Sequence, residues 1–135
     1  MKEVILGYDG SENGRRALLE AADLAHQGAK LTVLYAVRVP AMVGYPGNKK
    51  YSEGHAHAPG VLKEAEQLLS ELGVEAELVE AAGPPETALI DEARERAADV
   101  IVVGTRGLNA AKRLVLGSVS TKLVHEAPCS VFVVR

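Results

Sequence analysis

The length, composition and charge of the chain are those of an ordinary globular protein. Its 135 residues suit one domain covering residues 1–135, and 47% hydrophobic with 24% charged residues exclude disordered and fibrous classes. A formal net charge of −3 without a long basic run argues against a nucleic-acid partner, and no segment resembles a signal peptide or a membrane span. We therefore expect a cytoplasmic protein that contacts neither nucleic acid nor membrane.

The first part of the chain predicts a strand, a helix and a second strand. Residues Glu3 to Tyr8 contain a short apolar run, and the turn residues after it predict a helix that starts near Ser11. Apolar residues then recur at helical spacing until Gly28, which supplies a C-terminal stop. Leu31 to Val37 read as the second strand.

Residues from Arg38 to about Pro59 interrupt this pattern. Prolines and glycines are scattered through them, and neither a helical nor a strand period is present. We expect a long loop, and loops of this length inside compact domains are typically lids or disordered excursions. A second helix is predicted from about Val61 to Leu72, and Gly73 ends it.

The second half of the chain continues the alternation of strands and helices. Val74 to Glu80 alternates apolar and polar residues, as a strand near a sheet edge does. Strands that alternate with helices favour parallel pairing with right-handed crossovers, so we predict an α/β fold, a three-layer sandwich around a five-stranded sheet. The remaining predicted elements are a helix from Pro84 to about Ala97, a strand from Asp99 to Val103, a helix from Ser118 to Glu126 and a strand from Ser130 to Arg135.

A glycine-rich motif lies between the fourth predicted strand and the fourth predicted helix. Gly104-Thr105-Arg106-Gly107 is followed after nine residues by Gly117-Ser118. Glycines let the backbone approach a ligand closely, and the free amides of a helix start favour an anion. We expect the hydroxyls of residues 118–121 to cap this helix. Neither the P-loop nor the dinucleotide signature occurs in the sequence, so the motif predicts a phosphate site of another kind.

This spacing resembles the nucleotide-binding signature of the universal stress protein family, and Asp9-Gly10-Ser11 is similar to the family's first-strand motif. The resemblance covers nearly the whole chain except Arg38 to Gly60. It implies an adenine nucleotide α-hydrolase-like fold with four helices and a parallel sheet of order 3-2-1-4-5. It also implies ATP bound between the first and fourth strands, and leaves open whether magnesium accompanies it.

The resemblance further implies a role for each matching residue. Asp9 would contact the nucleoside end, the backbone of Ala36 would meet adenine, and residues 117–120 would present amides and hydroxyls to the phosphates. Arg106 either adds charge to the site or is a solvated loop cation, and both readings stay open. The complete set of predicted site residues is Asp9, Ser11, Ala36, Gly104, Arg106, Gly107, Gly117, Ser118, Val119 and Ser120.

Three functions are compatible with these observations. We expect first a small regulatory ATP-binding protein of the stress response without efficient turnover, because no catalytic residue is evident in the sequence. The alternatives are a slow ATPase or autophosphorylating phosphotransferase, in which Asp9 helps to hold a metal ion, and a homodimeric interaction module that pairs through Ser130 to Arg135. We predict no resident metal site, since His55 and His57 have no further ligand close by in the sequence.

Overall fold

Strands and helices alternate along the chain, as the sequence predicts. The computed structural model describes residues 1–37, 49–51, 60–105 and 117–135. Its strands are β1 (Glu3–Gly7), β2 (Lys30–Val37), β3 (Lys49–Tyr51), β4 (Ala76–Ala82), β5 (Val100–Gly104) and β6 (Ser130–Val134). Its helices are α1 (Glu12–His26), α2 (Gly60–Glu71), α3 (Pro85–Arg96) and α4 (Ser118–Glu126).

The strands of the described residues form one sheet in the order β3-β4-β2-β1-β5-β6. The five longer strands are all parallel to one another, which confirms the order 3-2-1-4-5 when the predicted strands are numbered along the chain. Strands β2 and β4 extend the sheet on one side of β1, and β5 and β6 extend it on the other. The strand order therefore reverses at β1, and open α/β sheets bind ligands at such a point, beyond the carboxyl ends of the strands.

The short strand β3 corrects one expectation. The sequence predicts only a loop over 38–59, yet Lys49–Tyr51 pairs antiparallel with Leu78 to Glu80 of β4. Three residues are too few to produce a recognisable period of two, so this strand is identified by its partner and not by its own pattern. The other residues of the predicted loop lie outside the described part of the chain.

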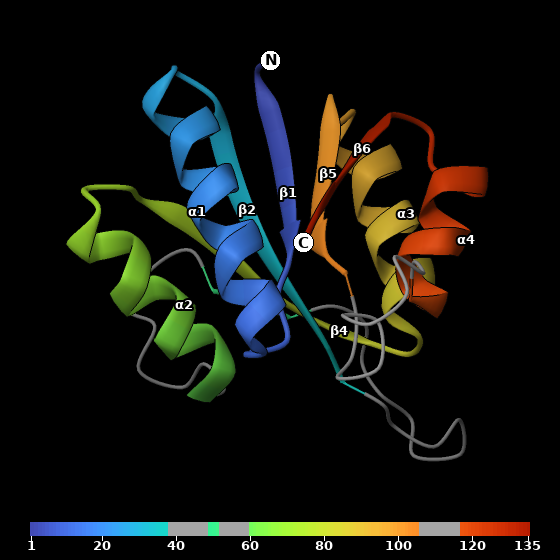
Figure 1. Cartoon of the computed structure of the whole chain (residues 1–135), viewed down its shortest axis with the longest axis horizontal. Helices are drawn as coiled ribbons and strands as arrows, with labels where there is room; N and C mark the ends of the chain where they lie inside the picture. Colours follow the sequence, from blue (N-terminus) through green and yellow to red (C-terminus); the bar gives the residue numbers. More distant parts are fainter. Residues whose placement is uncertain (38–48, 52–59, 106–116) are drawn as a thin grey trace.

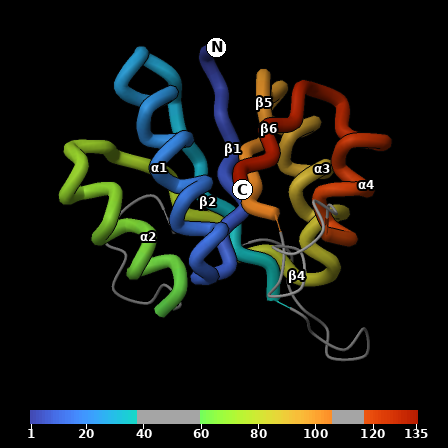
Figure 2. Tube along the Cα trace, viewed as in Figure 1, coloured from blue at the N-terminus to red at the C-terminus, as the bar shows by residue number. Residues whose placement is uncertain are grey.

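Helices cover both faces of the sheet and make three layers (Figure 1). Successive residues of β1 point to opposite faces, so Leu6 packs in the apolar cluster under α1 and α2, and Ile5 in the cluster under α3 and α4. Both side chains are fully buried. The chain begins at the amino end of β1 and finishes at the carboxyl end of β6 (Figure 2). The two apolar layers thus fix the carboxyl ends of the central strands relative to one another.

Charged side chains are buried near the amino ends of the strands. Arg96, in the last turn of α3, places its Nη1 2.7 Å from Glu77 Oε2 and donates from the same nitrogen to the Thr32 hydroxyl at 2.9 Å. Its Nε lies 2.5 Å from Oε2 of Glu92, whose side chain is fully buried. Since Thr32 and Glu77 are register partners on β2 and β4, the guanidinium joins α3 to two adjacent strands.

Candidate functional site

A pocket of about 150 Å³ lies beyond the carboxyl ends of β1, β2 and β5. These three strands are neighbours at the point where the strand order reverses. Leu89 of α3 and Val119 of α4 contribute to its wall, so the pocket opens on the side of the sheet that these two helices cover. The position is the one at which parallel α/β sheets bind small molecules.

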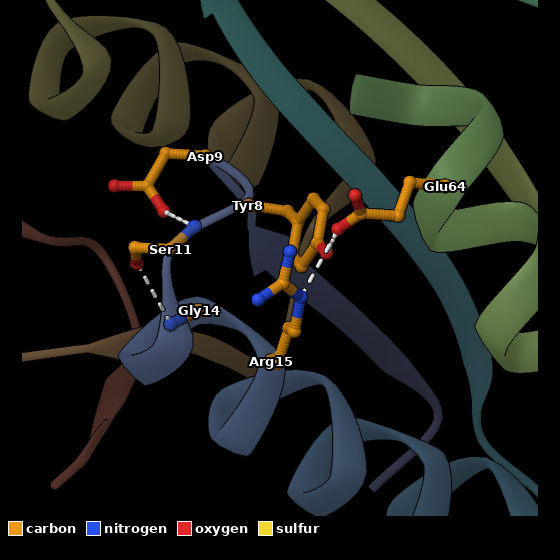
Figure 3. Close-up of polar contacts among 6 residues, drawn as sticks. All are labelled: Tyr8, Asp9, Ser11, Gly14, Arg15 and Glu64. Atoms are coloured by element: carbon orange, nitrogen blue, oxygen red, sulfur yellow. Dashed lines mark hydrogen bonds and ion pairs between the residues drawn. The ribbon is translucent and has the colours of Figure 1, made fainter. Parts of the chain in front are cut away.

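A tight turn between β1 and α1 forms one side of the pocket (Figure 3). The Asp9 carboxylate accepts a hydrogen bond from the Ser11 backbone N–H at 2.9 Å, and Gly10 takes a left-handed conformation with φ +82°. Ser11 is the N-cap of α1, and its hydroxyl oxygen accepts from the Gly14 N–H at 3.0 Å. Side chain and backbone therefore fix this turn before any ligand arrives.

Two glycines let the backbone segments around the pocket approach closely. A Cβ added to Gly104 would lie 2.5 Å from the backbone oxygen of Asn13, so a side chain there would push α1 away from β5. A Cβ added to Gly14 would lie 2.9 Å from the Asp9 carboxylate. Glycine is needed at both positions for contact distance, since neither residue has a positive φ.

Asn13 joins the start of α1 to the end of β5. Its side-chain amide donates to the Thr105 carbonyl oxygen at 2.6 Å and to the Thr105 hydroxyl at 3.2 Å. Thr105 lines the pocket and is the residue before Arg106, where the glycine-rich segment leaves the described part of the chain. The two sides of the pocket are thus connected through one amide side chain.

Tyr8 anchors the other end of the turn to α2. Its hydroxyl donates to the Glu64 carboxylate, and the Arg15 Nε lies 3.2 Å from the same carboxylate oxygen (Figure 3). Burial, followed by the hydrogen bond to Glu64, raises the pKa of Tyr8 to about 12, so the phenol remains a donor at physiological pH. The hydrogen bonds from Tyr8 and then Arg15 lower the pKa of Glu64, which therefore stays ionised.

The end of β2 extends beyond the end of β1. Gly7, the last residue of β1, pairs in register with Leu34, whose carbonyl oxygen accepts from the Tyr8 N–H at 3.0 Å. In a strand, the backbone N–H and C=O groups of every second residue point to the same neighbouring strand. Those of Ala36 therefore point to the same side as those of Leu34, toward β1. The chain turns into α1 after Tyr8, so β1 no longer runs beside Ala36, and Ala36 lines the pocket.

Helix α4 begins at Ser118, as predicted, but the expected hydroxyl cap is wrong. Its N-cap is Gly117 in an extended conformation (φ −68°, ψ 168°), and no side chain of the described residues caps it. Ser120 is instead buried and donates its hydroxyl hydrogen to the Gly117 carbonyl at 3.1 Å. Among the described residues, no side-chain acceptor therefore competes for the backbone amides in the first turn of α4, which includes the pocket residue Val119.

The structure brings only part of the predicted site together. Five predicted residues line the pocket: Asp9, Ser11, Ala36, Gly104 and Val119. Gly117 and Ser118 lie at the start of α4 beside Val119, whereas Ser120 faces the protein interior. Arg106 and Gly107 lie outside the described residues. The other residues that line the pocket were not predicted as site residues: Gly7, Tyr8, Gly14, Leu34, Tyr35, Pro85, Leu89, Val103 and Thr105.

These missed residues differ in how they could have been found. Gly7 and Gly14 flank the Asp9-Gly10-Ser11 motif, and a glycine directly after a buried strand is a signal of close approach. Leu89 has no such signal, because an apolar residue on a helix reads as core whether or not it also borders a pocket. Its place in the site follows only from the packing of α3 against the sheet.

Neither a metal site nor a membrane-spanning helix is found in the described residues. They hold no group of three or more histidine, cysteine or acidic side chains placed to hold a metal ion. His55 and His57 are outside them. The helices in these residues are too short or too polar to cross a bilayer.

Comparisons with known proteins agree on one family. The model described as "Universal stress protein family" matches residues 1–135. A relative from Thermus aquaticus, named a universal stress protein, is 39% identical over 137 residues, which cover 99% of this chain and 98% of the relative. The universal stress protein UspA from Lactobacillus plantarum has a TM-score of 0.76 at 25% identity, covering 99% of this chain and 97% of its own. A universal stress protein solved in complex with cAMP has a TM-score of 0.75 at 30% identity, with coverage of 99% and 97%.

Proposed function

The chain belongs to the universal stress protein family, and from this premise we propose that it binds ATP as a regulatory nucleotide-binding protein without efficient turnover. The observation that carries the proposal is the pocket at the reversal of strand order, with Ala36 of β2 on one side and, on the other, the start of α4, which no side chain of the described residues caps. Backbone groups of this kind suit a ligand with a hydrogen-bonding base at one end and an anion at the other.

The backbone of Ala36 is suited to adenine. One N–H donor and one carbonyl acceptor on the same residue match the base edge of adenine, which offers the N1 acceptor and the N6 amino donor. Guanine bound in the same orientation would place its O6 acceptor opposite the carbonyl and its N1–H donor opposite the N–H, so both backbone groups would be mismatched. We propose that adenine binds at the end of β2, with Asp9 near the ribose.

The start of α4 is suited to the phosphates. The backbone amides of Ser118 and Val119, together with the helix dipole, favour an anion there without a P-loop lysine. We propose that Ser120 does not bind the phosphates through its hydroxyl, because that hydroxyl already donates to the Gly117 carbonyl. It holds the N-cap residue in place while the amides bind the ligand.

A relative supports the class of ligand. The universal stress protein that was solved with cAMP is 30% identical to this chain and aligns over 99% of it. cAMP shares adenine and ribose with ATP and differs in its phosphate. The comparison therefore supports an adenine nucleotide, and the choice of ATP rests on the open start of α4.

Gly117→Asp tests the phosphate end of the site. The φ and ψ of Gly117 suit aspartate, which is a favourable N-cap residue, so we expect a folded variant. Its carboxylate would occupy the first-turn amides and repel the phosphates, so ATP binding measured by titration calorimetry should be lost. Gly60→Asp, at the open first residue of α2, is the matched control and should bind ATP as the wild type does. Undiminished binding by Gly117→Asp would refute the site.

Three further measurements separate the alternatives. Nucleotide released from freshly purified, denatured protein identifies the ligand, and titration with ATP and GTP, each with and without magnesium, measures the choice of base and the role of the metal. Incubation with labelled ATP under single-turnover conditions tests for hydrolysis or autophosphorylation. Conversion at about one per second, the low end of ordinary enzyme turnover, would favour the enzymatic alternative.

We also propose a homodimer that pairs through β6. This strand lies at the end of the described sheet, and its Phe132 keeps 40% of its surface exposed. Edge strands with exposed apolar side chains favour pairing with another chain. Light scattering at micromolar concentration should give the mass of two chains, and a monomer under these conditions would overturn the proposal.

A further inference from the structure

One carboxylate oxygen on α2 contacts both flanks of the turn that borders the pocket. Oε1 of Glu64 accepts the hydrogen bond from the Tyr8 hydroxyl and also lies 3.2 Å from the Arg15 Nε (Figure 3). Tyr8 comes directly before Asp9, and Arg15 directly after Gly14. A side chain from a separate helix therefore holds the turn at both of its ends.

The link through Tyr8 continues into the pocket. Tyr8 is 2% exposed, and it lines the pocket between Gly7 and Asp9. Its ring carbon Cδ1 lies 3.6 Å from the position of a Cβ built on Gly14, so the ring packs beneath the start of α1. A displacement of Tyr8 would move both the Asp9 carboxylate and the Gly14 backbone.

The neighbouring ion pair between Arg16 and Glu12 is an ordinary surface contact with which the Glu64 contact can be compared. Arg16 lies 2.9 Å from Glu12 on the same helix, with both side chains mostly exposed. That pair joins α1 only to itself. The Glu64 contact joins two helices and includes a buried hydroxyl, so its loss leaves a buried donor without its carboxylate partner.

We propose that Glu64 is a positioning residue for nucleotide binding: through Tyr8 and Arg15 it fixes the turn from Asp9 to Gly14 in the binding geometry. The proposal rests on the proposed ATP site and adds a regulatory link, because the position of α2 then sets the affinity of the pocket. A partner that moves α2 would change nucleotide affinity without touching the nucleotide.

The test compares Tyr8→Phe, Glu64→Ala and the double variant with Glu71→Ala, which removes a carboxylate from the last turn of the same helix. We expect each of the first two to raise the Kd for ATP by about three- to tenfold, as expected for the loss of one hydrogen bond. The double variant should be no weaker than the weaker single variant, because both remove the same link. Glu71→Ala should bind as the wild type does.

Amide hydrogen exchange of the nucleotide-free protein supplies a second measurement. The amides of Ser11 and Gly14, which are bonded within the turn, should exchange faster in Tyr8→Phe and Glu64→Ala and at the wild-type rate in Glu71→Ala. Unchanged exchange would show that Glu64 does not fix the turn, and faster exchange with unchanged ATP affinity would show that the turn does not position the nucleotide. A wild-type protein that binds no adenine nucleotide would refute the ATP site itself, while the exchange rates would still report on the turn.

Discussion

The two ends of the sheet differ in their structure: the amino end contains buried ion pairs, and the carboxyl end borders a pocket. At the amino end, Arg96 is surrounded by Glu77, Glu92 and the Thr32 hydroxyl, so charged side chains satisfy one another inside the protein. At the carboxyl end, Gly14 and Gly104 allow neighbouring segments to approach closely, and the ends of three strands border a pocket. The amino end therefore contributes to stability through buried ion pairs, whereas the carboxyl end leaves room for the proposed ligand. Substitutions at the amino end should change the free energy of unfolding without changing ligand affinity, whereas substitutions at the carboxyl end can change both.

The largest expected effect comes from Arg96→Ala at the amino end. It breaks the ion pair between Arg96 and the fully buried Glu92, and breaking a buried pair costs about 3–5 kcal/mol of unfolding free energy. Urea denaturation measures the loss, and ATP affinity should be unchanged at temperatures where the variant is folded. The control is Arg16→Ala, which breaks the exposed pair with Glu12 and should not measurably change stability. Equal losses in the two variants would contradict the comparison.

Gly104→Ala at the carboxyl end should lower both the free energy of unfolding and the affinity for ATP. Its Cβ would meet the Asn13 backbone oxygen at 2.5 Å, and backbone cannot rotate away as a side chain can. We expect a loss of about 1–3 kcal/mol in unfolding free energy, typical of overpacking, together with weaker ATP binding. Gly60→Ala is the control, because nothing lies within 4 Å of its added Cβ. If the Gly104→Ala variant is less stable but binds ATP as the wild type does, the close contact between Gly104 and Asn13 is not needed for the ATP site.

The two helix starts at the pocket should respond differently to loss of a hydroxyl. Ser11→Ala removes the N-cap of α1 and should cost about 1 kcal/mol in unfolding free energy. Ser118→Ala removes an exposed hydroxyl that caps nothing in the described residues and should change stability by less than about 0.5 kcal/mol. Thermal unfolding of both variants measures the contrast, and similar losses would mean that α4 is capped after all.

The smallest effect is a pH dependence at the amino end. Backbone N–H groups of Glu3 and Lys2 donate to Asp99 at 2.8 and 2.7 Å and lower its pKa, so the folded state favours the carboxylate. This contribution is present above the ordinary aspartate pKa of about 3.9 and is lost as the pH falls through the lower folded pKa. Thermal unfolding should show wild type more stable than Asp99→Asn at neutral pH, with the gap closing in acid. A gap that stays constant with pH would contradict the assignment.

Most of the fold could be predicted from the sequence because each long element carries its own signal. Helix α1 has a serine N-cap and regular apolar spacing, and α4 begins at Ser118 where the prediction placed it. The short strand β3 could not be predicted, since its identity depends on pairing with β4. The local sequence pattern is enough to predict a long helix or strand. It is not enough to predict a short strand that forms only because it pairs with a neighbouring strand.

The candidate site was predicted less completely, for a related reason. Asp9 and Gly104 belong to local motifs, and both line the pocket. The expected hydroxyl cap of α4 was wrong because a hydroxyl at a helix start can face outward or back to the preceding carbonyl, as that of Ser120 does, and the sequence does not distinguish the two. The contact from Glu64 to Tyr8 joins residues 56 positions apart, so no motif could reveal it.

The short antiparallel strand β3 bears on the proposed assembly of the protein. It pairs with Leu78 to Glu80 of β4 and so occupies backbone groups on that side of the described sheet. At the opposite side, β6 has a longer and more apolar sequence. In the proposed homodimer, two copies that meet through β6 would each cover the β6 edge of the other molecule. Such a pair would leave no unpaired β6 edge from which a fibre could grow.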